Sequence, residues 1–236
     1  AEGRRHGEEA LRLATMESRG ATPIVAHNSL GFLYLGKGDL EHAIRMFDQG
    51  LALCRASGNR DFLQGIVGAL GSAYALQGRL AEGRALLEEA ISEGIRTGVL
   101  RGPTYARLSE VCRLAGHGDE AWQHARQALD LARQQKARGD EALALYQLGT
   151  VQAYAAPPEV AQAESHYQQA LTLADELGMR PLQAHCHRGL GTLYAATGQR
   201  EQARTALSTA IEMYQSMAMT FWLPQTEAAL AQVAAR

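Results

Sequence analysis

Leu30-Gly31-Phe32-Leu33-Tyr34 begins a two-part cassette that occurs five times along this chain of 236 residues. The second part, Ala43-Ile44-Arg45-Met46-Phe47-Asp48-Gln49-Gly50, follows after a short polar turn. The later copies begin at Leu70, Leu108, Leu148 and Leu190, and their second parts begin at Gly83, Ala121, Ala163 and Ala203. Consecutive second parts are therefore 40, 38, 42 and 40 residues apart. A nearly constant period of this size is typical of a solenoid of stacked repeats.

Each cassette predicts two antiparallel helices. In the second helix, the first, fifth and eighth positions of the pattern share one face, as Ala43, Phe47 and Gly50 do. Small residues at the outer two positions let the helix axes approach, and the larger middle residue fills the space between the pairs. Because the third pair has Ala125 in the middle, we expect it to be either the most closely packed pair or the least well filled.

The predicted fold is all-α, a right-handed superhelical solenoid that forms one domain over residues 1–236. Thr22 and Pro23 are expected to supply an N-cap and a first-turn proline. Ala155-Ala156-Pro157-Pro158 replaces the glycine turn of the fourth pair and predicts a stiffer, displaced elbow. The expected elements are an N-terminal helix at 4–20, helix pairs at 23–57 (23–36 with 40–57), 61–97 (61–77 with 80–97), 103–136 (103–115 with 119–136), 140–177 (140–155 with 159–177) and 181–217 (181–197 with 200–217), and a capping helix at 222–235.

These patterns resemble the tetratricopeptide repeat family, whose signature combines Leu-Gly-x-x-Tyr with Ala-x-x-x-Phe-x-x-Ala. The first pair matches best, through Leu30, Gly31, Tyr34, Ala43 and Phe47. The family's early Trp and late Pro are missing, and the repeats exceed its usual ~34 residues by about six. The segment 210–233 is similar to the ends of such arrays in bacterial class III nucleotide cyclases and ATPase-containing regulators. Within it, we expect Phe221 and Trp222 to cover the end of the fifth pair.

Composition limits the classes of function. The chain has 46% hydrophobic residues and a net charge of −2 from 23 basic and 25 acidic side chains. This balance disfavours nucleic acid as a partner. Only three cysteines occur, and no segment looks like a membrane span or a secretory leader. We therefore expect reduced thiols, a cytoplasmic location and no membrane partner. Because the sequence does not begin with Met, we expect a fragment of a longer protein, with processing of the chain as the alternative.

The sequence offers little chemistry. The residue types in His185-Cys186-His187 suggest a metal-binding site. Residues two apart on a helix point in different directions, however, so we predict no metal site there. His117, Glu120 and His124 are interpreted as a solvated face. The sequence contains neither a phosphate-binding loop nor a nucleophile elbow. We therefore predict no catalytic residue, no cofactor and no enzyme activity.

The resemblance implies a concave groove lined by the first helix of each pair. Carried over by register, the groove is apolar at one end and polar toward the other, which suits a peptide or helix with an apolar anchor and one acidic group. The family's clamp for chaperone carboxylates needs a Lys and two Asn, of which only one Asn is in place. The expected groove residues are Asn28, Phe32, Leu35, Ser72, Glu110, Arg113, Tyr146, Thr150, Arg188 and Thr192.

The leading hypothesis is a non-enzymatic protein-interaction scaffold or regulatory module within a bacterial signalling protein. It would bind a partner segment, or other domains of its own parent chain, in the groove. The alternative is a sensor of a small ligand or peptide that controls an attached cyclase, ATPase or transcription-activator module. A polar pocket closed by Tyr146, Tyr154 and Arg188 favours the sensor, whereas a wide open groove disfavours it. A spacer, or self-association through an exposed solenoid end, is the remaining alternative.

Overall fold

The computed structural model describes residues 2–17, 20–59 and 62–235. In this part of the chain every regular element is helical, with twelve α-helices and one 3₁₀ turn. Internal contacts divide the chain into two compact units, residues 1–100 and 101–236, and each unit is described by itself. The expected single domain stays a prediction. None of the described helices is long and apolar enough to cross a membrane.

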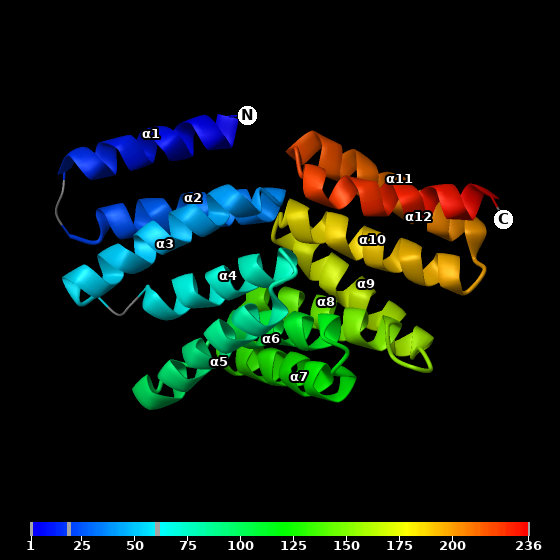
Figure 1. Cartoon of the computed structure of the whole chain (residues 1–236). Coiled ribbons are helices and arrows are strands. Elements are labelled where there is room, and N and C mark those ends of the chain that lie inside the picture. The colour runs from blue at the N-terminus through cyan, green and yellow to red at the C-terminus, as the bar shows by residue number, and fades with distance from the viewer. Residues whose placement is uncertain (1, 18–19, 60–61, 236) are drawn as a thin grey trace. The chain divides into compact units, whose positions relative to one another are not determined.

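The first unit contains an N-terminal helix and two helix pairs (Figure 1). Its tightest packing joins α2 to α3 and α4 to α5. The bounds are α1 (Glu2–Glu17), α2 (Thr22–Lys37), α3 (Leu40–Ser57), α4 (Leu63–Leu76) and α5 (Leu80–Thr97). The predicted boundaries near residues 18–20 and 60–61 fall partly on residues 18, 19, 60 and 61, which lie outside the described ranges.

The second unit contains three helix pairs and a capping helix. Within it α6 packs on α7, α8 on α9 and α10 on α11, and α12 then packs on α11. The bounds are α6 (Gly102–Leu114), α7 (Gly118–Gln134), α8 (Arg138–Ala153), α9 (Val160–Glu176), α10 (Arg180–Ala196), α11 (Arg200–Met217), η1 (Thr220–Trp222) and α12 (Leu223–Ala235). The expected architecture of five helix pairs, an N-terminal helix and a C-terminal capping helix is confirmed.

One expected cap is wrong. Thr22 is the first residue of α2 rather than its N-cap, because the backbone of Ala21 already has helical angles and holds the cap position without a side-chain hydrogen bond. Pro23 does lie in the first turn of α2, where its missing N–H costs nothing. At the other end of α2, Gly38 takes a φ of 77° and donates its N–H to the carbonyls of Leu35 and Tyr34, which closes the helix.

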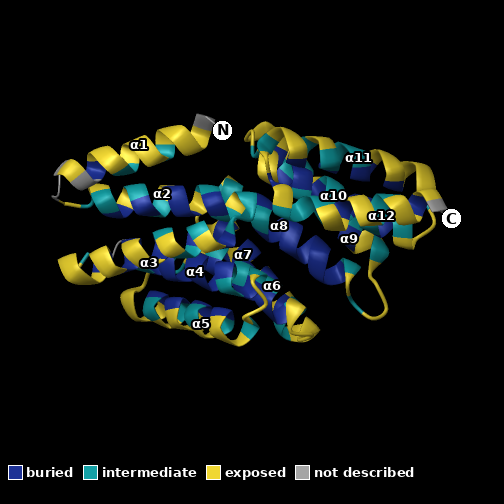
Figure 2. Ribbon diagram, turned by 45° about the horizontal axis from the view of Figure 1, so that its top comes forward, coloured by how far each residue is buried: buried dark blue, intermediate teal, exposed yellow. Residues whose placement is uncertain are grey.

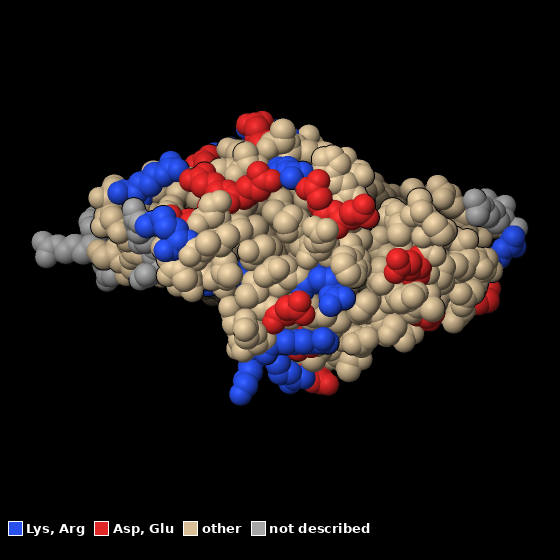
Figure 3. Space-filling model, turned by 90° about the horizontal axis from the view of Figure 1, so that it is seen from below, with Lys and Arg blue, Asp and Glu red and all other residues tan. Residues whose placement is uncertain are grey.

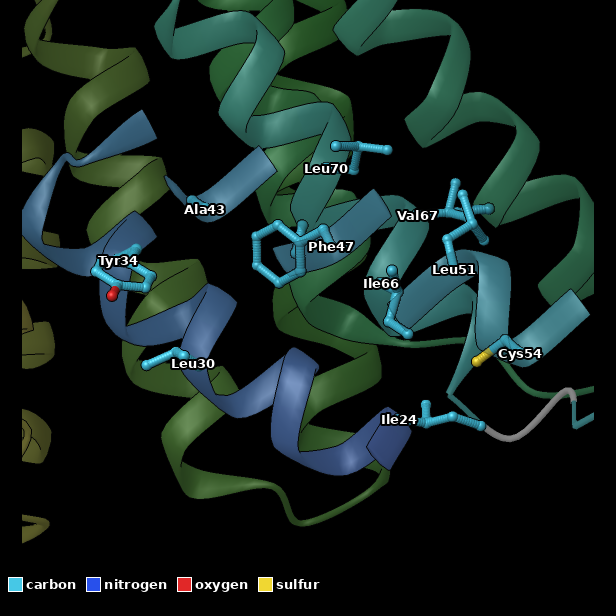
Figure 4. Packing of buried hydrophobic residues seen from close by; sticks show 12 residues of the cluster. Ile24, Leu30, Tyr34, Ala43, Phe47, Leu51, Cys54, Ile66, Val67 and Leu70 are labelled. Carbon is cyan, nitrogen blue, oxygen red and sulfur yellow. The ribbon is translucent and has the colours of Figure 1, made fainter. Parts of the chain in front are cut away.

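The motif glycines allow the two helices of each pair to touch. Figure 4 shows Phe47 of α3 inside the core of the first unit, with Ala43 and Leu30 nearby. A Cβ added to Gly31 would lie 2.6 Å from Phe47 Cε1, so the aromatic ring occupies the space that glycine leaves. In the second unit, a Cβ at Gly191 would lie 2.6 Å from Leu207 Cγ. The Leu-Gly pattern is thus a steric requirement of the packing.

The third pair solves the same packing problem differently. Ser109 replaces the motif glycine, and its hydroxyl donates to the carbonyl of Ala121 at 2.7 Å. Both Ser109 and the facing Ala125 are fully buried. The larger residue on α6 is therefore matched by a smaller one on α7.

The capping helix is attached through an aromatic turn. Trp222 and Leu223 pack against a cluster that contains Ala184 and Tyr214. The Trp222 ring meets the His185 ring edge-on at 4.8 Å, and Phe221 meets Trp222 in the same manner at 4.9 Å. Trp222 therefore packs on the fifth pair, and Phe221 packs on Trp222.

The contact between α4 and α5 gives a test of the packing. Gly83→Ala would place a Cβ 2.5 Å from the carbonyl oxygen of Gly71, which is backbone and cannot rotate away. We expect Gly83→Ala to lower the free energy of unfolding by about 1–3 kcal/mol. The matched control is Gly65→Ala, because a Cβ at Gly65 meets nothing within 4 Å. This control should be neutral or stabilising by up to about 1 kcal/mol. Urea unfolding followed by circular dichroism measures both, and equal effects would contradict the account.

Candidate binding site

The second unit contains a cavity of about 370 Å³ between its helix pairs. It is lined by parts of α6, α8, α9 and α10 and by the elbow between α8 and α9. Most of α8 is buried along its length (Figure 2). All six expected groove residues of this unit line the cavity, namely Glu110, Arg113, Tyr146, Thr150, Arg188 and Thr192.

Arg188 is the central cation of the cavity. One of its guanidinium nitrogens donates to Tyr146 Oη at 3.5 Å, and its guanidinium carbon lies 5.1 Å from the centre of the Trp222 ring. Within the described ranges, Arg188 forms no ion pair with a carboxylate. An arginine keeps its charge at any physiological pH and has five N–H donors to satisfy. Most of the hydrogen-bonding capacity of Arg188 is therefore open to a bound group.

Arg113 is a second cation in the lining. Its guanidinium carbon lies 4.9 Å from the centre of the Tyr154 ring, and its Nε is buried without a hydrogen-bond partner. A buried donor without a partner costs free energy, which an incoming acceptor would offset. The cavity thus contains an unsatisfied N–H next to an aromatic ring.

The Tyr167 ring forms part of the cavity wall. Gly189 permits this position, since a Cβ there would lie 2.6 Å from Tyr167 Cζ. The Tyr167 hydroxyl donates to Thr150 Oγ1 at 3.2 Å, and Thr150 Oγ1 in turn donates to the carbonyl of Tyr146. Burial raises the pKa of both Tyr146 and Tyr167 above the ordinary value, so both phenols remain neutral.

The charges that line the cavity are two arginines and one glutamate, Glu110. This set leaves a balance of one positive charge, which favours a group with a single negative charge. On the face shown in Figure 3, basic and acidic side chains are interspersed among uncharged ones. Such a surface does not favour polyanions.

The other four expected groove residues lie in the first unit and are considered separately. Phe32 is partly exposed and packs edge-on against Phe47 at 5.3 Å. Leu35 packs against the hydrophobic core, and Ser72 donates to the carbonyl of Gly68 at 3.3 Å. Asn28 Oδ1 is buried without a partner. The role of these four residues in binding stays a prediction.

The His185-Cys186-His187 segment is part of the packing around the cavity. His185 Nδ1 shares a hydrogen bond with Tyr214 Oη at 2.7 Å, and its ring also lies 6.0 Å from that of Tyr146. Burial lowers the pKa of His185 to about 3, so its imidazole is neutral. Burial likewise raises the pKa of the Cys186 thiol to about 12.

Sequence reasoning missed one group of potential metal ligands. Among the described residues, Cys112, Glu120 and His124 place a sulfur, a carboxylate oxygen and a ring nitrogen within 4.8 Å of one another. The interpretation of Glu120 and His124 as a solvated face considered one helix alone. The information that was needed is the register between α6 and α7, because this register places Cys112 next to Glu120 and His124.

The fold is that of a helical-repeat protein built from antiparallel helix pairs. The comparison with family models indicates the type of repeat. Residues 24–57 and residues 159–216 each match the Tetratricopeptide repeat family. These two segments are therefore similar to tetratricopeptide repeats, and together they cover less than half of the chain. None of the curated proteins compared with it matches at a significant level.

Three solved structures show the same fold. BtubC (BKLC) from P. vanneervenii is 22% identical with a TM-score of 0.59, and the match covers 90% of this chain and 88% of that one. A Rap protein complexed with competence and sporulation factor is 13% identical with a TM-score of 0.74, over 91% and 63% of the two chains. A signal transduction ATPase with numerous domains from Pyrococcus horikoshii, which has a tetratricopeptide repeat sensor, is 17% identical with a TM-score of 0.59, over 93% and 36%. This chain therefore spans less than two thirds of the last two proteins.

The buried His185 predicts a pH dependence of stability. Its folded pKa of about 3 lies below its ordinary value of 6.5, so below pH 6.5 the unfolded state binds a proton that the folded state does not. Stability is complete above pH 6.5 and is lost as the pH falls from there toward 3. Between pH 7 and pH 5, the wild type should lose about 2 kcal/mol more of its unfolding free energy than His185→Gln does.

Denaturant unfolding at a series of pH values measures this difference. The control is Gln123→Ala, because Gln123 is exposed on α7 and its side chain carries no ionisable group. That control should follow the pH profile of the wild type. A His185→Gln profile parallel to that of the wild type would contradict a buried neutral imidazole.

Proposed function

We propose that the chain is a non-enzymatic interaction module that binds a partner segment. In this proposal the cavity of the second unit receives an apolar side chain and one acidic group of the partner. The observation that carries the proposal is the pair of arginines, Arg113 and Arg188, which line the cavity without a carboxylate partner in the described part of the chain.

The physical reason is the cost of a partly desolvated charge. A guanidinium that has lost water needs an anion or several acceptors to compensate, and a carboxylate can bind it through two parallel hydrogen bonds. The phenol rings of Tyr146 and Tyr167 provide an apolar wall next to this anion site. The cavity thus suits an acidic group that has an aromatic or aliphatic neighbour.

The matches to tetratricopeptide repeats support the same kind of function, since such repeats form protein-interaction scaffolds. Two of the similar structures support this kind of function, because one is a Rap protein complexed with competence and sporulation factor and another has a tetratricopeptide repeat sensor. We propose a regulatory role within a larger bacterial signalling protein in the cytoplasm. The cytoplasmic part rests on the few cysteines, which suit a reducing compartment.

A second candidate function is a sensor for a small ligand or short peptide. The cavity itself favours it, because Tyr146, Tyr154 and Arg188 line one volume of about 370 Å³. Small-molecule sites range from about 300 to 1,000 Å³, so this cavity is large enough for a small ligand. In this case the ligand would fill the cavity alone, without further contacts along the first helices.

Selection of displayed random peptides on the immobilised chain tests the leading proposal. We expect enriched peptides to carry an Asp, a Glu or a free carboxyl terminus beside an aromatic or aliphatic residue. Arg188→Gln should weaken their binding by about 10- to 100-fold, since a hydrogen bond to a charged group is lost. Arg113→Glu combined with Arg188→Glu should abolish it.

The matched control is Arg180→Glu, because Arg180 lies on the same helix but is exposed, and its guanidinium donates to Ser216 Oγ at 3.1 Å. Circular dichroism should show unchanged helicity in all these variants. Peptides without acidic groups, or equal affinity for wild type and Arg188→Gln, would contradict the proposal. If no peptide is enriched but a small monocarboxylate raises the melting temperature of wild type and not of Arg188→Gln, the sensor function replaces it.

A further inference from the structure

A second site of different chemistry lies in the third helix pair, at Cys112 of α6 and at Glu120 and His124 of α7. One ligand atom from each residue lies within 4.8 Å of the other two. The Cys112 thiol makes a long contact of 4.0 Å with Glu120 Oε2. These three side chains combine a soft sulfur, an imidazole and a carboxylate, the ligand types that zinc accepts in proteins.

The repeat architecture explains why the three side chains meet. Cys112 occupies the position that Tyr34 holds in the first pair, where the tyrosine ring lies 5.0 Å from the ring of His42. His42 directly precedes Ala43, as Glu120 directly precedes Ala121. The register of the pair therefore places residue 120 over residue 112, and the cysteine is much smaller than the usual tyrosine.

Helix geometry adds the third ligand. Glu120 and His124 are four residues apart on α7, so their side chains lie on the same face one turn apart. Cys112 is fully buried, whereas Glu120 and His124 are partly exposed. A metal ion could reach the cluster from the solvent side and rest on the sulfur below.

We propose that Cys112, Glu120 and His124 bind a zinc ion with a water molecule as the fourth ligand. In a tetrahedral site with Zn–S of about 2.3 Å and Zn–N or Zn–O of about 2.0–2.1 Å, neighbouring ligand atoms are about 3.3–3.7 Å apart. The three ligand atoms lie within 4.8 Å of one another. Rotation of the Glu120 and His124 side chains would bring them to these shorter distances. On binding, the Cys112 thiol releases its proton to solvent and the sulfur ligates as a thiolate.

His117 supports the site from outside. Its Nδ1 lies 3.6 Å from Glu120 Oε1, the carboxylate oxygen opposite the one that faces Cys112. Its backbone N–H donates to the carbonyl of Cys112 at 2.8 Å, which fixes the turn between the two ligating helices. A second-sphere contact of this kind orients a ligating carboxylate.

The proposal is tested with the whole chain after removal of metal by a chelator. Titration with Co²⁺ should give one equivalent of bound ion, tetrahedral visible bands and a near-ultraviolet thiolate-to-cobalt band. Zn²⁺ should displace Co²⁺ and raise the melting temperature by several degrees. Cys112→Ser should abolish the thiolate band and weaken Zn²⁺ binding by more than about 100-fold.

Two further variants keep the test informative. His124→Gln leaves the buried cysteine in place and should also remove the Zn²⁺ effect on the melting temperature. Cys54→Ser removes another buried cysteine, in the first unit, and should bind Co²⁺ as the wild type does. The proposal is overturned if the wild type shows no thiolate band, if the band survives Cys112→Ser, or if Zn²⁺ raises the melting temperatures of the wild type and of His124→Gln equally.

Discussion

The close contact between the two helices of each pair is the constraint on which the rest of the structure depends. In the first pair Gly31 lies against Phe47, and in the fifth Gly191 lies against Leu207, with no room for a Cβ in either place. This contact fixes which face of each first helix turns inward. It therefore determines which residues of α6, α8 and α10 remain to line a cavity.

The cavity of the second unit depends on this close helix contact and on two local departures from the repeat pattern. Gly189 precedes the motif Leu190-Gly191 and gives the Tyr167 ring space to reach the cavity. The elbow after α8 brings Tyr154 next to Arg113. Two arginines, three phenol rings and one glutamate then enclose a volume suited to a single acidic group and its apolar neighbour.

Periodicity was sufficient to predict the helix pairs. The family resemblance, carried over by register, supplied six residues that line one cavity, and their role in binding stays a prediction. Periodicity could not show that Tyr167 reaches that cavity, since the same ring also fills the core between pairs. It missed the cluster at Cys112 because the approach of Glu120 and His124 depends on packing between two helices. Thr22 was misplaced by one position, because no sequence pattern shows that Ala21 already has helical backbone angles.

The central claim is that Arg188 is the anion-binding residue of a partner-binding cavity, and a crystal structure of the chain with a selected acidic peptide tests it most directly. The account predicts a carboxylate about 2.7–2.9 Å from the Arg188 guanidinium, with the neighbouring apolar side chain against Tyr146 and Tyr167. A peptide bound elsewhere on the chain, with Arg188 making no contact to it, would contradict the account.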